Sequence, residues 1–207
     1  VCVPTLIELG SIATGMLVAS DITRDGLERT LERLNSEGAG ADDFRNNFAS
    51  LTLGSGAVAA VLRRRDPARP GHRLLGAVWN ADTTHNDLCV ASNHEMRADA
   101  HGLLVHGVDC AVRTWPKATE AFGWSPDRPD EVIFHQVGLT HFVNTFERLE
   151  ISLDKALVTF PYLGNTGPVS VPITLSVGVQ QGRIQPGQEV ALFGVGSGLG
   201  SLILGVE

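Results

Sequence analysis

The chain has 207 residues, of which 43% are hydrophobic and 19% are charged. These proportions exclude a disordered or fibrous chain and predict a globular protein with one large domain or two small ones. The formal net charge of −7 disfavours nucleic-acid binding, since domains of that kind usually carry a basic face. We expect no membrane span, because no apolar run approaches the roughly 18 residues that a spanning helix requires.

The apolar patterns predict alternating helices and strands along the chain. In chain order they are a helix ending at Gly10, a strand over 13–20, a helix over 24–38, a tight turn into a buried strand within 48–65, a strand over 72–82, a polar irregular stretch over 83–100, a helix over 103–122 that contains Pro116, a strand over 132–136, a helix over 139–151, a turn and helix within 164–184, and a β-hairpin over 188–207. The 23 glycines allow close packing of layers, so we expect a layered fold of sheets and helices.

Two glycine-rich segments resemble each other at a distance of 142 residues. The stretch "TLGSGAVAAVL" at 52–62 and the stretch "GVGSGLGSLIL" at 194–204 each place a GSG turn before an apolar strand. This repetition predicts a duplicated α/β unit. Chance similarity between two glycine-rich strands is the alternative.

The cysteines and the one basic cluster carry little functional signal. Cys2, Cys89 and Cys110 are odd in number and far apart, and no CxxC pair occurs. They therefore predict reduced thiols in a cytoplasmic protein, and not a disulfide framework. The basic cluster at 63–73 contains two prolines and a glycine, which predicts a solvated turn. A docking patch for a phosphate-bearing ligand is the alternative.

The strongest candidate for a site is His135 together with Asn165. His135 ends an apolar strand, and ligands commonly bind beyond the carboxyl ends of strands in open α/β sheets. Asn165 lies in the turn "LGNTGP", where glycines let the backbone come close to a ligand. An imidazole N–H and an amide N–H aimed at one oxygen would stabilise an enolate or an oxyanion. The alternatives are a packed core histidine and an ordinary turn-forming asparagine.

A second candidate is the polar segment at 84–106. Its possible metal ligands are His85, Asp87, Cys89, His94, Glu95, Asp99, His101 and His106. Their spacing fits no zinc motif, because "HEMRA" is not HExxH, and His101 and His106 are five positions apart. We therefore expect a polar loop over a cleft and no metal. The segment "GVGSGLG" is no P-loop, and no GxSxG elbow occurs.

Together, "FHQVGLTH" and "LGNTGPVSVPITL" resemble the C-terminal half of the thiolase superfamily, in its ketoacyl-ACP synthase III branch. "ALFGVGSGLGSLIL" and "TLGSGAVAAVL" resemble the glycine-rich strands of that branch. Within it, "FASLTLGSGA", "HNDLC", "RADAHGLL" and "GNTGP" are similar to the OleA-type thiolases of long-chain olefin and β-lactone biosynthesis, which condense acyl-CoA. The resemblance runs from about Ile7 to Glu207. His135 and Asn165 match the branch's His and Asn motifs, 30 residues apart.

The resemblance implies a five-layer αβαβα thiolase-like fold that is incomplete at its N-terminus. Residues 1–75 would be the remainder of the N-terminal half, and residues 76–207 would be the C-terminal half. It implies a Claisen condensation of acyl thioesters, with His135 and Asn165 catalytic and His141 a structural neighbour. Acyl-CoA or acyl-ACP would be the substrate, no cofactor would be needed, and the protein would be a homodimer or a heterodimer with a Cys-bearing homologue.

One feature departs from the family pattern. The family nucleophile is a Cys at the start of a buried helix, a position that lowers its pKa. It would lie roughly four helical turns before "LIELGSI", whereas only six residues precede Ile7. We do not assign this role to Cys2, and we expect Cys89 and Cys110 to be packed thiols. The chain is therefore expected to be an inactive fragment of a condensing enzyme. The alternatives are a 3-oxoacyl-ACP synthase III that uses malonyl-ACP, a non-catalytic subunit of a condensing enzyme, and a hydrolytic α/β domain.

Overall fold

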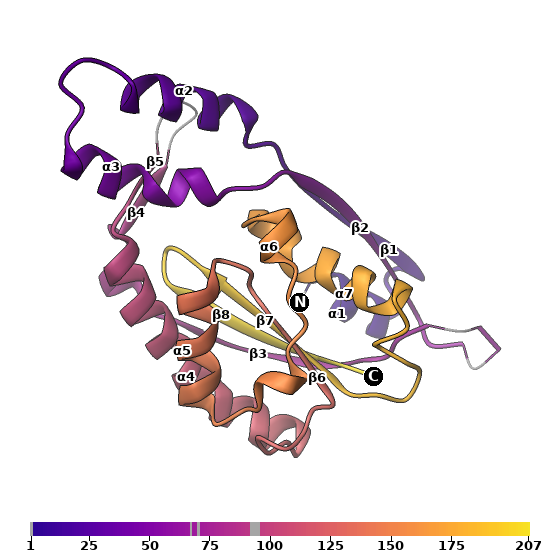
Figure 1. Ribbon diagram of the computed structural model, residues 1–207. Coiled ribbons are helices and arrows are strands. Elements are labelled where there is room, and N and C mark those ends of the chain that lie inside the picture. The colour runs from indigo at the N-terminus through magenta and orange to yellow at the C-terminus, as the bar shows by residue number, and fades with distance from the viewer. Residues whose placement is uncertain (1, 67, 70, 92–95) are drawn as a thin grey trace.

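The computed structural model of the protein describes residues 2–66, 68–69, 71–91 and 96–207. Within these residues, a four-stranded sheet with the order β3-β8-β7-β6 and a two-stranded sheet of β1 and β2 form the framework (Figure 1). The strands are β1 (Thr14–Asp21), β2 (Gly56–Arg63), β3 (Leu74–Ala81), β4 (Cys89–Ala91), β5 (Met96–Ala98), β6 (Glu131–Phe134), β7 (Val190–Gly196) and β8 (Gly200–Val206). The expected strands and the C-terminal hairpin are confirmed.

The helices lie between groups of strands; five of them match the predicted helices, and the two over 41–47 and 160–163 are additional. They are α1 (Cys2–Glu8), α2 (Arg24–Leu34), α3 (Ala41–Asn47), α4 (Ala100–Phe122), α5 (Leu139–Leu149), α6 (Phe160–Leu163) and α7 (Ser170–Gln180). The Asp99 side chain caps α4 by accepting from the Gly102 N–H, and Pro116 lies inside this helix. None of the described helices combines the length and the apolar character that a membrane crossing needs.

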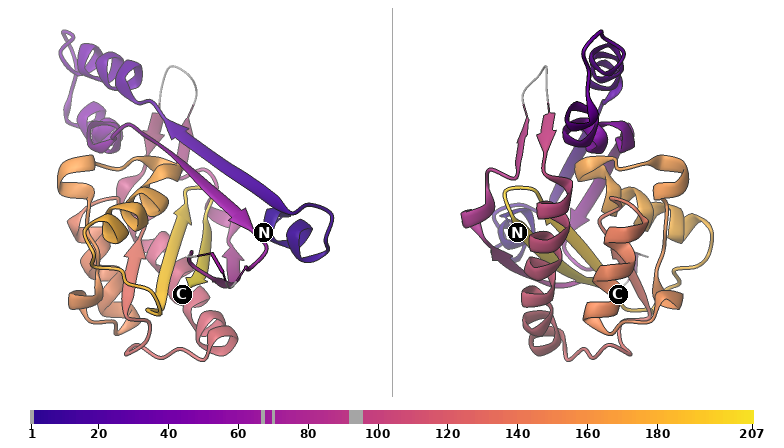
Figure 2. Two further views of the ribbon diagram at one scale, coloured as in Figure 1. Left: turned by 90° about the vertical axis from the view of Figure 1, so that its right-hand side faces the viewer. Right: turned by 60° about the vertical axis from the view of Figure 1, so that its left-hand side comes forward.

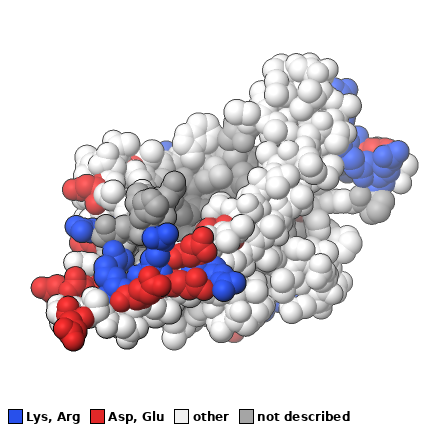
Figure 3. Space-filling view, turned by 90° about the horizontal axis from the view of Figure 1, so that it is seen from above, with Lys and Arg blue, Asp and Glu red and all other residues white. Residues whose placement is uncertain are grey.

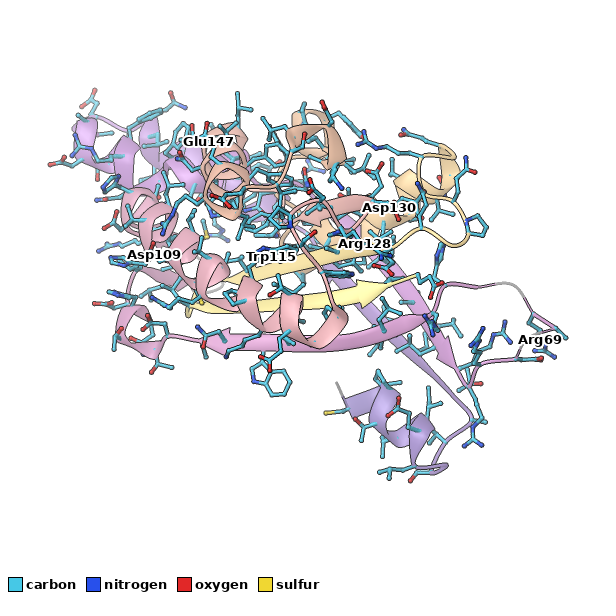
Figure 4. The ribbon with its side chains drawn as sticks, turned by 90° about the horizontal axis from the view of Figure 1, so that it is seen from below. Arg69, Asp109, Trp115, Arg128, Asp130 and Glu147 are labelled. Carbon is cyan, nitrogen blue, oxygen red and sulfur yellow. The ribbon has the colours of Figure 1, made fainter. Side chains whose placement is uncertain are left out.

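Both faces of the four-stranded sheet are covered at β6 and β7. Side chains alternate along β6, so that Val132 and Phe134 join the core beneath α4 and α5 while Ile133 joins the core beneath α7. Trp115 lies on the side of α4 that faces the sheet (Figure 4), where its ring contacts Phe193 of β7. This double cover explains why β6 reads as a continuous apolar run.

The β1–β2 hairpin is much more open. Its strands pair antiparallel over eight residues each. Figure 2 shows them as a long ribbon with α2 and α3 at one end and α1 at the other. The expectation of a buried strand is wrong for β2, because most of its side chains are exposed or only partly covered. The reason is that β1 is its one described strand partner, and the cover on it is limited mainly to parts of α1, α7 and the 3-10 turn Gly167–Val169.

The stretch at 83–100 also differs from expectation, since it is not irregular throughout. A short 3-10 turn (Thr83–His85) is followed by β4 and β5, which pair antiparallel. Three paired residues per strand are too few for a strong periodic signal, which is why the pattern was not visible in the sequence.

Candidate active site

His135 follows β6 directly, at the carboxyl end of the strand. Its backbone N–H donates to the Phe193 carbonyl of β7 at 2.9 Å, so the neighbouring strand fixes the backbone of His135. Burial lowers the pKa of His135 to about 4, because a charged imidazole is poorly solvated there. At neutral pH the ring is therefore uncharged, with one nitrogen as a donor and the other as an acceptor.

Asn165 lies in the turn between α6 and a 3-10 turn (Gly167–Val169). Its side-chain Oδ1 accepts the Gly167 N–H at 3.1 Å. Because a backbone N–H can only donate, this contact requires the amide oxygen on that side and leaves the Nδ2 hydrogens for another acceptor. The turn therefore orients Asn165 as a donor.

The first glycine-rich motif holds this turn in place. The Asn165 N–H donates to the Thr52 carbonyl at 2.9 Å, and the Gly54 N–H donates to the Asn165 carbonyl at 2.8 Å. A Cβ on Gly54 would lie 1.8 Å from the Leu163 oxygen, so only glycine fits. Gly164 has φ +69, and a Cβ there would lie 2.8 Å from the Thr52 oxygen. The glycine-rich motif at 52–56 thus allows close backbone contact with the turn that carries Asn165.

Gln136 connects the end of β6 to the chain that leads into Asn165. Its side chain is 2% exposed. Oε1 accepts from the N–H groups of Thr159 at 2.9 Å and Phe160 at 3.2 Å. Nε2 donates to the carbonyls of Phe134 at 2.7 Å and Leu157 at 3.3 Å. All the polar atoms of this buried amide are therefore satisfied, as a buried polar group requires.

The same residue also connects β6 to the chain that leaves Asn165. The Gln136 N–H donates to Ser170 Oγ at 2.8 Å, and Ser170 is the first residue of α7. Gln136 thus bonds to segments on both sides of Asn165. The expectations identified His135 and Asn165 but missed Gln136 and Ser170. The only signal in the sequence was a polar Gln beside an apolar strand.

His135 and Asn165 line one cavity of about 2030 Å³. It lies between the β1–β2 hairpin and the four-stranded sheet, with apolar side chains such as Leu17, Leu104 and Leu192 in its wall. In Figure 3, charged side chains gather over α2 and α3 and over the loop after β2, whereas the hollowed middle carries few charges. The cavity therefore suits a ligand with a long apolar part.

The three cysteines have different surroundings. Cys110 is fully buried, and burial raises the pKa of its thiol, which confirms the expectation of a packed thiol. Cys89 is only partly buried and lines the cavity, so the same expectation is wrong for Cys89. Cys89 is the first residue of β4, a three-residue strand at the cavity wall that leaves part of the thiol uncovered. Cys2 is exposed on α1.

The polar segment at 84–106 gathers no metal ligands within the residues that the structure describes. No three side chains of His, Cys, Asp or Glu come together in that part of the chain. The candidates His94 and Glu95 lie outside the described residues. The rings of His85 and His106 stack at a centroid distance of 3.7 Å, which is contact between ring faces and not the convergence of nitrogens on one point.

The basic cluster forms the loop between β2 and β3, and Arg69 lies on it at the end of the molecule away from α2 and α3 (Figure 4). Arg69 pairs with Asp66 at 3.4 Å, and Arg73 pairs with Glu207. Arg64 donates to the Ile7 carbonyl at 3.2 Å. These contacts support a solvated turn whose arginines bind neighbouring groups.

Comparison with known proteins gives concordant relatives. Residues 119–205 match the family of the 3-oxoacyl-[acyl-carrier-protein] synthase III C-terminal domain. The acyl-CoA:acyl-CoA alkyltransferase of Xanthomonas campestris is 35% identical over 194 residues, which cover 94% of this chain and 57% of the relative. The alkyltransferase of Shewanella oneidensis is 35% identical over 215 residues, covering 97% and 61%. The β-ketoacyl-[acyl-carrier-protein] synthase III of Dinoroseobacter shibae is 30% identical over 174 residues, covering 78% and 54%.

The fold agrees with these relatives. The crystal structure of Xanthomonas campestris OleA with bound lauric acid and lauroyl-CoA matches with a TM-score of 0.94 at 34% identity. That match covers 98% of this chain and 60% of the OleA chain, so the chain spans about three fifths of the length of this relative. The expected thiolase-like fold is confirmed. Residues 119–205 therefore form a 3-oxoacyl-[acyl-carrier-protein] synthase III C-terminal domain, and the chain has the thiolase-like fold of OleA.

Proposed function

We propose that this chain forms the carbonyl-binding part of an enzyme that condenses two long-chain acyl-CoA molecules into a β-ketoacyl product. The observation that carries the proposal is the pair of neutral donors, His135 and Asn165, on the wall of one apolar cavity. The names of the Xanthomonas and Shewanella relatives and the lauroyl-CoA in OleA support acyl-CoA as the substrate.

The proposed chemistry requires a place for negative charge on a thioester oxygen. In the first step, a cysteine thiolate attacks one acyl thioester, and the CoA thiolate leaves. In the second step, a second acyl thioester loses an α-proton to a base, and its α-carbon attacks the enzyme-bound acyl group with release of the cysteine thiolate. His135 and Asn165 hold the thioester oxygen of the second substrate, where enolate charge develops. One such donor contributes on the order of 10²–10³ in rate.

None of the three cysteines fits the nucleophile in this scheme. Cys2 is exposed on a seven-residue helix, and the buried Cys110 has a raised pKa, which disfavours its thiolate. Cys89 lies on a three-residue strand and not at the start of a helix, where the nucleophile of this scheme is expected. We therefore expect residues 1–207 alone to bind acyl thioesters without condensing them.

A binding and turnover experiment tests this proposal. The chain is titrated with lauroyl-CoA by calorimetry, and the mixture is then searched for β-ketoacyl product by mass spectrometry. We expect binding that weakens roughly 3- to 10-fold in His135→Ala and in Asn165→Ala, the loss of about one hydrogen bond, and no product. Absence of binding would refute the proposed substrate, and a condensation product would reinstate Cys2 or Cys89 as the nucleophile.

A second candidate function is the 3-oxoacyl-ACP synthase III reaction, which uses malonyl-ACP. The family match at 119–205 and the Dinoroseobacter relative favour it. A parallel titration with malonyl-ACP separates the two functions, because a chain of this kind would prefer malonyl-ACP to a second lauroyl-CoA. We further propose a cytoplasmic location and association with a second copy or with a Cys-bearing homologue.

A further inference from the structure

His141 is a second histidine that lines the cavity, and the reaction proposed above does not use it. It is the third residue of α5 and is 9% exposed. Its ring contacts the Phe134 ring at a centroid distance of 5.4 Å, and its backbone carbonyl accepts from Thr145 Oγ1 at 2.7 Å. The side chain lines the same cavity as His135 and Asn165. His141 is therefore a largely buried side chain in the wall of the site.

The hydrogen bonding of this ring is incomplete. Nδ1 of His141 is enclosed by protein and has no hydrogen-bond partner among the described residues. Burial and the nearby His135 lower the pKa of His141 to about 4, so the ring is neutral at pH 7 and carries one proton. An enclosed N–H without an acceptor is among the rarest situations in folded proteins. The proton therefore belongs on Nε2, and Nδ1 is left as a bare acceptor.

The end of the ring that carries Nε2 is not covered by a side chain of α4. Gly107 of that helix faces it, and a Cβ on Gly107 would lie 3.7 Å from Nε2. The glycine gives the ring space on this side. Nε2, unlike Nδ1, is not an enclosed atom without a partner, and His141 lines the cavity that also contains His135. An N–H at this end can therefore reach that cavity.

We propose that His141 is a further ligand-binding residue of the site, whose Nε2–H donates a hydrogen bond to an oxygen of the acyl thioester that contacts His135 and Asn165. This inference rests on the proposed function, since the ligand is the same. The enclosed Nδ1 has no partner among the described residues, so it places the ring proton on Nε2. The bound thioester supplies the acceptor for this Nε2–H in the cavity wall.

A comparison of substituted chains tests the reach of this donor. In His141→Gln the amide nitrogen reaches the position of Nε2, whereas in His141→Asn it reaches only the position of Nδ1. The two variants are equally polar and serve as matched controls for each other, and His141→Phe removes all hydrogen bonding. We expect lauroyl-CoA to bind within about 3-fold of the unsubstituted chain in His141→Gln and about 10-fold more weakly in the other two. Equal affinity in all three variants would overturn the inference.

A measurement on the unsubstituted chain tests whether His141 contacts the ligand even if a variant fails to fold. The ring nitrogens of both histidines are followed by ¹⁵N NMR during titration with lauroyl-CoA. We expect the His135 signals and the His141 Nε2 signal to move together. Movement of the His135 signals alone would overturn the inference and leave the proposed function standing. Movement of neither would overturn the proposed function itself.

Discussion

The four-stranded sheet and the β1–β2 hairpin have similar apolar sequences but very different surroundings. Phe134 and Phe193 of the four-stranded sheet are completely buried, whereas Val18 and Val61 of the β1–β2 hairpin are 67% and 63% exposed. The difference lies in the cover, because α4, α5 and α7 enclose β6 and β7 of the first sheet and little covers the second. The apolar sequence of a strand thus indicates that it can be buried. Whether it is buried depends on the helices and strands that pack against it.

This contrast bears on the site. His135 belongs to the enclosed sheet, and the hairpin side reaches the site through the bridge between Leu53 and Asn165. The donor on the sheet is held by a packed core, and the second donor is held by backbone contacts between two glycine-rich segments. The predictions below test whether stability and binding follow this division.

The largest expected effect is on the enclosed sheet. Phe134→Ala removes a fully buried ring from the main core and should lower the free energy of unfolding by about 3–5 kcal/mol. Val18→Ala on β1 is the matched exposed change and should stay within about 0.5 kcal/mol. Urea unfolding followed by tryptophan fluorescence measures both. Similar losses in the two variants would mean that the hairpin is as well packed as the sheet.

The next effect concerns the link between the two donors. Gln136→Met keeps the volume but leaves the N–H groups of Thr159 and Phe160 without their acceptor, which should cost about 2–4 kcal/mol. Gln181→Met, at the exposed end of α7, is the control and should be neutral in the same urea titration. A neutral Gln136→Met would show that Gln136 does not hold the segment before Asn165.

The two similar glycine motifs allow a matched pair of substitutions. Gly54→Ala places a Cβ 1.8 Å from the Leu163 oxygen, whereas the nearest atom to a Cβ at Gly196 is 4.0 Å away. We expect Gly54→Ala to cost about 1–3 kcal/mol and to displace Asn165, and Gly196→Ala to cost less. Thermal unfolding and the amide NMR signals of residues 163–167 report the two effects. A larger loss at Gly196 would refute the role given to Gly54.

The smallest effect is the dependence of stability on pH. The pKa of His141 is about 4 in the folded chain and about 6.5 in an unfolded one, so the unfolded chain binds more protons between these values. Its contribution to stability is present above pH 6.5 and is lost as the pH falls towards 4. At pH 5.5 the loss should be about 1 kcal/mol relative to pH 7.5.

The control for this prediction is His141→Gln, which should show a flatter curve of unfolding free energy against pH. Glu131, whose pKa is raised by burial, acts equally in both chains and cancels in the difference. Identical slopes for the two chains would contradict a neutral, buried His141.

The sequence alone was sufficient to predict the features that depend on the pattern of neighbouring residues. The strand before His135, the turn at Asn165 and the helical period of α5 were all predicted from neighbouring residues. It was not sufficient for features that depend on distant contacts. The exposure of β2 depends on which elements pack on it, and Gln136 bonds to groups up to 34 residues away. The division into halves at 1–75 and 76–207 remains a prediction, and β3 begins at Leu74 near that boundary.

The pairing of His135 with Asn165 on one thioester oxygen is the central claim, and the vibration of the bound carbonyl tests it most directly. Lauroyl-CoA labelled with ¹³C at the carbonyl is bound to the chain, and the infrared difference spectrum against the unlabelled ligand isolates this group. Two donors should shift the stretch to lower frequency than in water, and His135→Ala or Asn165→Ala should each reverse part of the shift. A carbonyl band that is unchanged by both substitutions would contradict the proposed site.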